Sequence, residues 1–338
     1  MPTNISYATD DLVDYMVLSI LPNIPELTAD GILNSNFALA ALDKKGARDI
    51  DDGGLEIWGD ITKQENTNAQ WQGKSEEMKA TAQDPAERLR YPYRVFTASV
   101  VTNDLEKAQA SGKFMIKDLV KRLTNQAITT IGNAFNSGLW VAAPSGNQPN
   151  SIPSLIPATT AGAQTGTHPG GITRVGHPEL QTDVYTTAIA DIGSEAGISQ
   201  MVRLRARSAI GKDMVDIILL DEANWAGLAA YLTTLMRYAP GQSTIGMDIE
   251  YIQMGKCFIG FESTRVFTGA NTITAGRMYG INSKHMKIKV LKEGNGIWEK
   301  TFERVGRSLN KALYYKWFGN LCDYLPRAHF CASSVATT

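Results

Sequence analysis

The most constraining feature of this sequence is a helical periodicity that begins at Asn103 and runs to about Trp140. Thr102 and Asn103 are suitable N-cap residues for such a helix. At about 1.5 Å per residue the helix would be about 50 Å long, and its apolar side is expected to face a sheet. Apolar residues recur at steps of three and four, most clearly at Leu119, Leu123, Ile131 and Phe135.

A long hairpin is predicted just before this helix. Leu55–Trp58 alternates between apolar and polar residues and predicts one strand, and Tyr93–Thr97 predicts a second. The residues between them, Glu65–Ala86, are mostly polar. A connection of this length is unusual within a compact domain, so we expect it to reach away from the core and to have a function. The preceding Asp49–Gly54 predicts a turn.

The remaining sequence predicts an α+β fold whose second half contains an α/β part. Asp10–Ile20 predicts a short helix, Phe37–Leu42 is an apolar patch, and Pro144 to Pro178 predicts a long connection. The later predicted elements are helices at Ile198–Gly211 and Asn224–Arg237, and strands at Val215–Leu220, Ile249–Gln253, Lys256–Glu262, Met286–Leu291 and Ala312–Leu321.

Charge is balanced overall but divided unevenly along the chain. The 338 residues carry 33 Lys and Arg and 34 Asp and Glu, which argues against binding DNA through a strong bulk positive field. Residues 1–60, however, hold 11 acidic and 3 basic side chains, against 23 and 30 in the rest. Such asymmetry indicates an interaction between charged parts, although a solvated acidic surface explains it equally well.

Neither a membrane span nor a secretory signal is expected. No run of about 18 apolar residues occurs, and no basic region precedes an apolar one at the N-terminus. Cys257, Cys322 and Cys331 fit no zinc framework. We expect them to be reduced thiols in a cytoplasm.

Signatures of catalysis are weak, and no enzyme activity or cofactor is expected. Gly73-Lys74-Ser75 ends like a phosphate loop, but Asn68 stands where that motif requires glycine. Asp221 and Glu222 follow a predicted strand, where catalytic acids are often found, yet capping of the next helix is the simpler interpretation.

Arginines form the densest basic cluster. Arg203 and Arg207 share one face of a predicted helix and favour ion pairs within or between subunits over phosphate contacts. Lys113, Lys117 and Lys121 form a second basic stripe, which is either a solvated face or a contact for an anionic partner.

Several runs, taken with the order of elements from about residue 50 to 331, resemble a known family. Ala108–Lys113 with Ile116–Leu119 is similar to the start of its spine helix, and Met278–Asn282 to a run before its returning strands. Trp317–Cys322, followed by Pro326 and Arg327, is similar to its closing strand. The chain resembles the major capsid protein of tailed bacteriophages, with the Hong Kong 97-type shell fold.

The resemblance implies a division of the chain into parts. These are an N-terminal arm at 1–50, an extended two-stranded loop at 51–100, and a peripheral domain with a long spine helix at 101–177. An α/β axial domain at 178–283, returning peripheral strands at 284–326, and a C-terminal strand and tail at 327–338 follow.

The resemblance also implies a structural and non-enzymatic role. Copies would form the pentamers and hexamers of an icosahedral shell around double-stranded DNA, bound without sequence readout. The chain would occupy the virion capsid, and the host cytoplasm during assembly. Expected partners are a separate scaffolding protein, a portal and a decoration protein. Inter-subunit contacts are expected at Asp10, Asp11, Asp14, Trp58, Lys63, Trp71, Lys74, Lys79, Arg203 and Arg207.

Two other functions stay open on the sequence. An encapsulin-like compartment shares the shell fold but encloses cargo enzymes instead of a genome. A cytosolic α/β hydrolase or transferase would be a compact monomer with a deep polar pocket.

Overall fold

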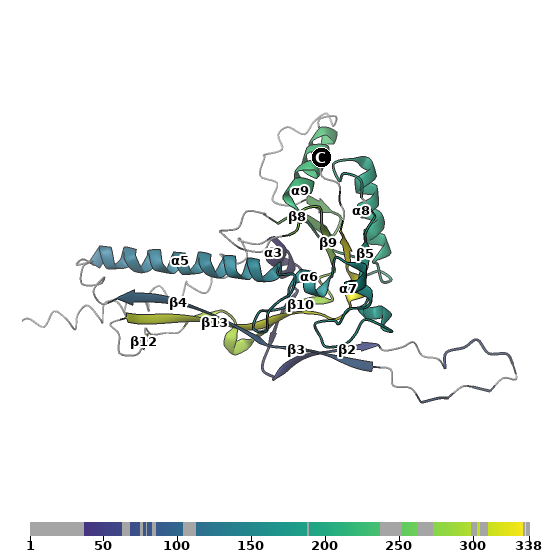
Figure 1. The fold of residues 1–338 in the computed structure, drawn as a ribbon, viewed down its shortest axis with the longest axis horizontal. Helices are drawn as coiled ribbons and strands as arrows, with labels where there is room; N and C mark the ends of the chain where they lie inside the picture. Colours follow the sequence, from purple (N-terminus) through teal and green to yellow (C-terminus); the bar gives the residue numbers. More distant parts are fainter. Residues whose placement is uncertain are drawn as a thin grey trace, which may run out of the picture.

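The computed structural model describes residues 37–62, 68–74, 77–78, 80–82, 86–103, 113–187, 189–236, 252–262, 273–298, 303–304, 310–333 and 335. Their strands form two six-stranded sheets and a separate two-stranded hairpin (Figure 1). Helices occur with both sheets, so the mixed α+β class predicted from the sequence is confirmed.

The first sheet is organised around one long strand, β13 (Asn310–Asp323). Strand β4 (Arg94–Asn103) runs antiparallel to it through ten residue pairs. β10, β11 and β12 also pair with β13, and β1 joins the far edge by running parallel to β10. The bounds of these four strands are Arg48–Asp51 for β1, Met286–Leu291 for β10, Ile297–Trp298 for β11 and Glu303–Arg304 for β12.

The long predicted helix is α5 (Lys113–Leu139), which lies along β4 and β13 (Figure 1). Ile131 is fully buried, and the Phe135 ring packs 5.1 Å from Phe96 and 4.8 Å from Trp317, measured between centroids. Ile131 and Phe135 therefore face the sheet as predicted, whereas the side chains of Leu119 and Leu123 lie outside the described residues. The side chains of the lysine stripe, Lys113, Lys117 and Lys121, also lie outside the described residues. None of the described helices is long and apolar enough to cross a membrane.

The second sheet has the order β5–β14–β9–β6–β8–β7, with the wholly buried β6 (Ile217–Leu220) inside it. Side chains of β6 alternate between two cores. Ile218 and Leu220 pack with residues of helices α8 and α9, whereas Ile217 and Leu219 point into a central core. The other bounds are Asp183–Tyr185 for β5, Ile252–Met254 for β7, Cys257–Phe261 for β8, Met278–Ile281 for β9, Phe330–Ala332 for β14, Glu195–Arg207 for α8 and Glu222–Met236 for α9.

The central core joins the two sheets to the hairpin. The hairpin consists of β2 (Glu56–Thr62) and β3 (Ala86–Pro92), paired antiparallel. Its inward residues Ile57 and Leu89 pack in the same core as Tyr279 of the second sheet and Leu321 of the first. The remaining short helices of the described chain are α3 (Phe37–Lys44), α6 (Ile152–Leu155), α7 (Thr160–Gln164), and the 3₁₀ turns Pro178–Leu180, Lys292–Gly294 and Pro326–Ala328.

One sequence prediction that fails is the turn at Asp49–Gly54. Arg48–Asp51 is strand β1, because β10 offers it a parallel edge and Lys289 lies 3.3 Å from Asp49 and 3.1 Å from Asp51. This tertiary pairing outweighs the low strand propensity of aspartate. The turn is confined to the residues that follow.

The boundaries around β4 also differ from the prediction. Thr102 and Asn103 were expected to cap the long helix, but both lie in β4, opposite Lys311 and Asn310. The predicted strand Tyr93–Thr97 does not close the hairpin: residues from Arg94 onward belong to β4. The hairpin's second strand is the more polar β3, in which only Leu89 and Tyr91 are buried. The predicted helix at Asp10–Ile20 lies outside the described residues.

A buried carboxyl group docks α3 onto the second sheet. Oε1 of Glu262, just after β8, accepts a hydrogen bond from the Ala38 backbone N–H at 2.5 Å. This N–H lies in the first turn of α3, where no intrahelical acceptor exists. Glu262 is 3% exposed, and burial raises its pKa to about 8, although the Ala38 N–H favours the ionised form.

We predict that replacing Ile131 by Ala lowers the free energy of unfolding by about 2–5 kcal/mol, because its side chain leaves a cavity between α5 and the sheet. Thr129→Ala, on the exposed side of the same helix, should change it by less than about 0.5 kcal/mol. Urea denaturation of the unassembled chain measures both. Equal losses would mean that α5 presents a different side to the sheet.

A pH dependence is predicted for Glu262. Its folded pKa of about 8 exceeds the ordinary 4.5, so the folded chain retains a proton that the unfolded chain releases between these values. Its contribution to stability therefore falls as pH rises through that interval. Glu262→Gln keeps the acceptor for Ala38 and should gain stability relative to the parent between about pH 5 and 8. Exposed Glu293→Gln is the control. A parent–mutant difference that stays constant over this range would contradict the assignment.

Candidate subunit-contact surface

The hairpin presents large apolar side chains to solvent. Leu55 is 95% exposed, Trp58 60%, Trp71 102% and Met78 82%. We call these four residues the hairpin surface. Exposed apolar area costs about 25 cal/mol per Å² relative to burial, so side chains of this size concentrated on one projecting element indicate a surface that another molecule covers.

The base of the hairpin holds Trp58 in a defined orientation. The Arg88 guanidinium lies over the Trp58 ring, 4.9 Å from its centroid. Arg88 Nε donates a hydrogen bond at 2.8 Å to Oδ1 of Asp60, the residue directly opposite Arg88 in the ladder. Strand alternation sends Ile57 and Leu89 into the core, so Trp58 and Arg88 share the outward face. The ring is thus ordered before any partner binds.

Polar contacts across the loop order the described part of the hairpin tip. The Asn68 side chain donates to Thr81 O at 2.8 Å and accepts from Thr81 N at 3.2 Å. The amides of Gln70 and Gln72 each donate to Glu77 O at 3.4 Å. The polar residues of this loop therefore bond to one another and leave Trp71 to project.

A buried polar junction fixes the hairpin to the body. The Tyr91 hydroxyl donates to Asp323 O, the last residue of β13, and accepts from Asp323 N at 3.3 Å. Arg90 N also donates to Gly170 O at 3.1 Å, in the connection after α7. The hairpin thus hydrogen-bonds to two separate parts of the body, which limits its freedom to swing.

The carboxyl group of Asp323 continues this junction into the second sheet. His329 Nδ1 accepts the Asn282 N–H at 3.0 Å, so Nε2 carries the proton that is donated to Asp323 Oδ1 at 3.0 Å. Burial disfavours the carboxylate, but His329 and the Leu325 N–H favour it more strongly and hold the pKa of Asp323 below its ordinary value. The Asp323 and His329 side chains are wholly buried. An acid–histidine pair sealed in this way cannot meet a substrate.

Two more buried polar residues complete the surroundings of the junction. His168 Nδ1 accepts the Gly170 N–H at 3.1 Å, and burial lowers the pKa of His168 to about 3. The buried Arg174 guanidinium donates to Leu180 O at 2.7 Å and to Leu155 O at 2.8 Å. Carbonyl acceptors thus compensate for removing this charge from water and fasten the long connection in place.

The structure describes only some of the sequence-predicted contact residues. Trp58, Trp71 and Lys74 are exposed on the hairpin. Arg203 and Arg207 lie on α8, whose buried side packs against the second sheet (Figure 1). Arg207 Nε forms an ion pair with Asp183 at 2.8 Å, the intra-subunit alternative considered from the sequence. The other five, Asp10, Asp11, Asp14, Lys63 and Lys79, lie outside the described residues.

Ion pairs within the subunit neutralise part of the uneven charge. Asp49 and Asp51 pair with Lys289, and Asp52 lies 3.5 Å from Lys292. These aspartates belong to the acidic first 60 residues and their partners to the basic remainder. The asymmetry seen in the sequence therefore serves folding as well as any contact between subunits.

The described residues hold no metal-binding cluster and no exposed cysteine. No group of three His, Cys, Asp or Glu side chains among them could hold a metal ion. The three cysteines are buried and unpaired, and burial raises the pKa of Cys257 to about 11 and of Cys331 to about 12, which disfavours reactive thiolates. Asp221 directly precedes α9, and its carboxylate accepts hydrogen bonds from the side-chain amide of Asn224 and from Gly276 N at 3.1 Å. It thus links the start of α9 to the loop before β9, through donors other than the first-turn backbone N–H groups that the capping interpretation predicts.

Comparisons identify the fold but no close relative. No family model matches the sequence, and no curated protein matches it. The structure is similar to a chain of the cyanophage A-1(L) capsid asymmetric unit, with a TM-score of 0.59 and 13% identity over 86% of this chain and 90% of that one. It is also similar to the capsid chain of a native GTA particle, with a TM-score of 0.57 and 9% identity over 88% and 91%.

A third comparison, with the capsid chain of an empty GTA particle, gives a TM-score of 0.51 and 10% identity over 88% of this chain and 90% of that chain. All three likenesses extend over most of both chains. The fold is therefore the Hong Kong 97-type fold of tailed-phage and GTA capsid proteins, as the resemblance in the sequence implied.

We predict that Tyr91→Phe destabilises the chain by about 1–3 kcal/mol, because buried backbone groups of Asp323 lose their hydroxyl partner while the ring's packing is kept. Tyr231→Phe is a matched control, since that hydroxyl makes no hydrogen bond with the described residues. Thermal unfolding measures both variants. Unchanged stability in Tyr91→Phe would show that the junction does not hold the hairpin.

Proposed function

We propose that this chain is a major capsid protein whose copies assemble into pentamers and hexamers of an icosahedral shell around double-stranded DNA. The hairpin surface carries this proposal: it is apolar, ordered and exposed in the single chain. The likeness in fold to phage and GTA capsid chains supports it. In such a shell the hairpin would lie over a neighbouring subunit and bury Trp58 and Trp71. Obligate interfaces commonly bury thousands of Å², which suits an element that gains little within its own subunit.

The finer division of labour is part of the same proposal. The sheet around β13, with α5, would be the peripheral domain, and the sheet containing β6 would be the axial domain at the symmetry axes. Of the predicted arm at 1–50, residues 37–50 pack on their own subunit as α3 and β1, so the part before Phe37 would reach across subunits, with Asp10, Asp11 and Asp14 facing basic surface of a neighbour. A separate scaffolding protein, a portal and a decoration protein would act in assembly. The role is structural, without enzyme activity, in the virion capsid.

A net charge of −1 fits this role. Many copies can pack closely without strong mutual repulsion, and DNA inside the shell would be confined rather than bound by sequence. An encapsulin-like compartment would share the shell but not its content. Mass spectrometry and nucleic-acid analysis of purified particles separate these two functions. Only an encapsulin-like compartment would enclose cargo protein in place of DNA.

We predict that the double variant Trp71→Ser, Met78→Ser folds with unchanged thermal stability but fails to form stable shells, because both side chains are exposed in the subunit and buried only on a neighbour. Val175→Ser, which removes an exposed apolar side chain outside the hairpin, should assemble normally. Light scattering and negative-stain microscopy measure assembly. Normal shells from the double variant would refute the role of the hairpin surface.

A shorter variant tests the whole loop. Removing residues 65–84 should leave a folded and soluble chain that no longer makes stable shells. An unfolded product would instead show that the loop belongs to the core of its own subunit. A parent chain that stays a monomer under all assembly conditions would contradict the capsid function itself.

A further inference from the structure

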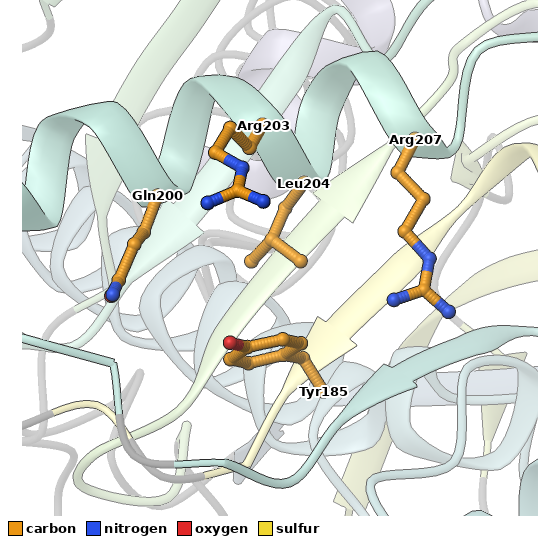
Figure 2. A pocket seen from close by; sticks show the side chains of 5 residues that line it. All are labelled: Tyr185, Gln200, Arg203, Leu204 and Arg207. Atoms are coloured by element: carbon orange, nitrogen blue, oxygen red, sulfur yellow. The ribbon is translucent and has the colours of Figure 1, made fainter.

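A second surface feature lies on the sheet that contains β6, away from the hairpin. Figure 2 shows a hollow between α8 and the end of β5, lined by Tyr185, Gln200, Arg203, Leu204 and Arg207. Four of these residues occur at positions i, i+3, i+4 and i+7 of α8 and so share one face of the helix. Leu204 forms its buried floor, and the polar groups surround it.

The polar groups around this hollow are hydrogen-bond donors. Gln200 Oε1 already accepts the Ala190 N–H at 2.9 Å, which leaves the amide NH₂ of Gln200 to donate. Arg203 makes no ion pair or hydrogen bond with the described residues, so its whole guanidinium is available to a ligand there. The Tyr185 ring lies across the hollow from Arg203, and its hydroxyl is a further donor (Figure 2).

The charge of the hollow favours a ligand with one negative charge. Arg207 Nε is paired with Asp183 at 2.8 Å, so these two charges cancel. The Arg203 guanidinium then leaves the hollow with a net charge of +1. Both arginines lie toward the C-terminal end of α8, where the helix dipole disfavours anions. Attraction of an anion therefore depends on the guanidinium and not on the helix.

We propose that the hollow between α8 and β5 is a binding site for a singly charged oxyanion, a carboxylate or a phosphate group held by Arg203 with Tyr185 and Gln200. The planar guanidinium matches two oxygens of such a group, and charge-assisted hydrogen bonds of this kind are among the strongest in proteins. The group comes either from solution or from an acidic side chain of a second copy of this chain. Only the second source rests on the proposed shell assembly.

Inorganic phosphate tests the site directly. It is titrated into the unassembled full chain by calorimetry, at constant ionic strength and mildly acidic pH, where phosphate carries mostly one charge. We expect saturable binding that weakens at least about tenfold in Arg203→Gln and less in Tyr185→Phe. Arg122→Gln, which removes an exposed arginine of α5, should bind as the parent does. No saturable binding, or equal binding by Arg203→Gln and the parent, overturns the proposal.

Assembly kinetics distinguish the two sources of the oxyanion. If a second copy supplies a carboxylate, phosphate should slow assembly of the parent relative to chloride at equal ionic strength, and Arg203→Gln should already assemble slowly without it. If the group comes from solution, phosphate should leave the rate of parent assembly unchanged. Because the titration uses unassembled chain, it reports on the site even if no shell forms, so failure of the site and failure of the capsid function remain separate results.

Discussion

Strand β13 and the residue that ends it are the elements on which the rest of this structure depends. The strand pairs with β4, β10, β11 and β12. At its end, Asp323 meets Tyr91 of the hairpin through its backbone and His329 through its side chain. His329 in turn accepts the N–H of Asn282, which follows β9 of the other sheet. One residue thus hydrogen-bonds directly to the hairpin and, through His329, connects the first sheet to the second.

Such a junction explains how a hairpin with little packing of its own can project in a fixed direction. A two-stranded ribbon is marginally stable in water when nothing else supports it. Here Ile57, Leu89 and Tyr91 anchor its base in the central core, so the projecting part inherits order from the body. If the hairpin meets a neighbouring subunit as proposed, its orientation would matter more than its local stability, because a pre-ordered surface loses less conformational entropy on binding.

The sequence predicted those helices and strands whose formation depends on their own residues rather than on distant contacts. The aliphatic run of β6 and the periodicity of α5 are local signals, and Trp58, Trp71 and Lys74 are exposed on a hairpin inferred from polarity and length. β1 was not recognised, because Asp49 and Asp51 become strand residues only when β10 and Lys289 lie beside them. The junction was also not recognised: Tyr91 and Asp323 are 232 positions apart, and nothing near either residue signals the other.

The two proposed contact surfaces would contribute to recognition through different physical interactions. The hairpin surface is apolar, so its contribution grows with the area covered and depends little on direction. The hollow beside α8 has one uncompensated guanidinium, whose hydrogen bonds are directional and weaken as salt screens the charge. Apolar burial would thus supply most of the affinity between subunits, and charged contacts would select the register in which the subunits meet. Electrostatic complementarity generally contributes more to the specificity of an interface than to its affinity. It also follows that raising salt should loosen the register before it separates the subunits, since apolar burial is not screened.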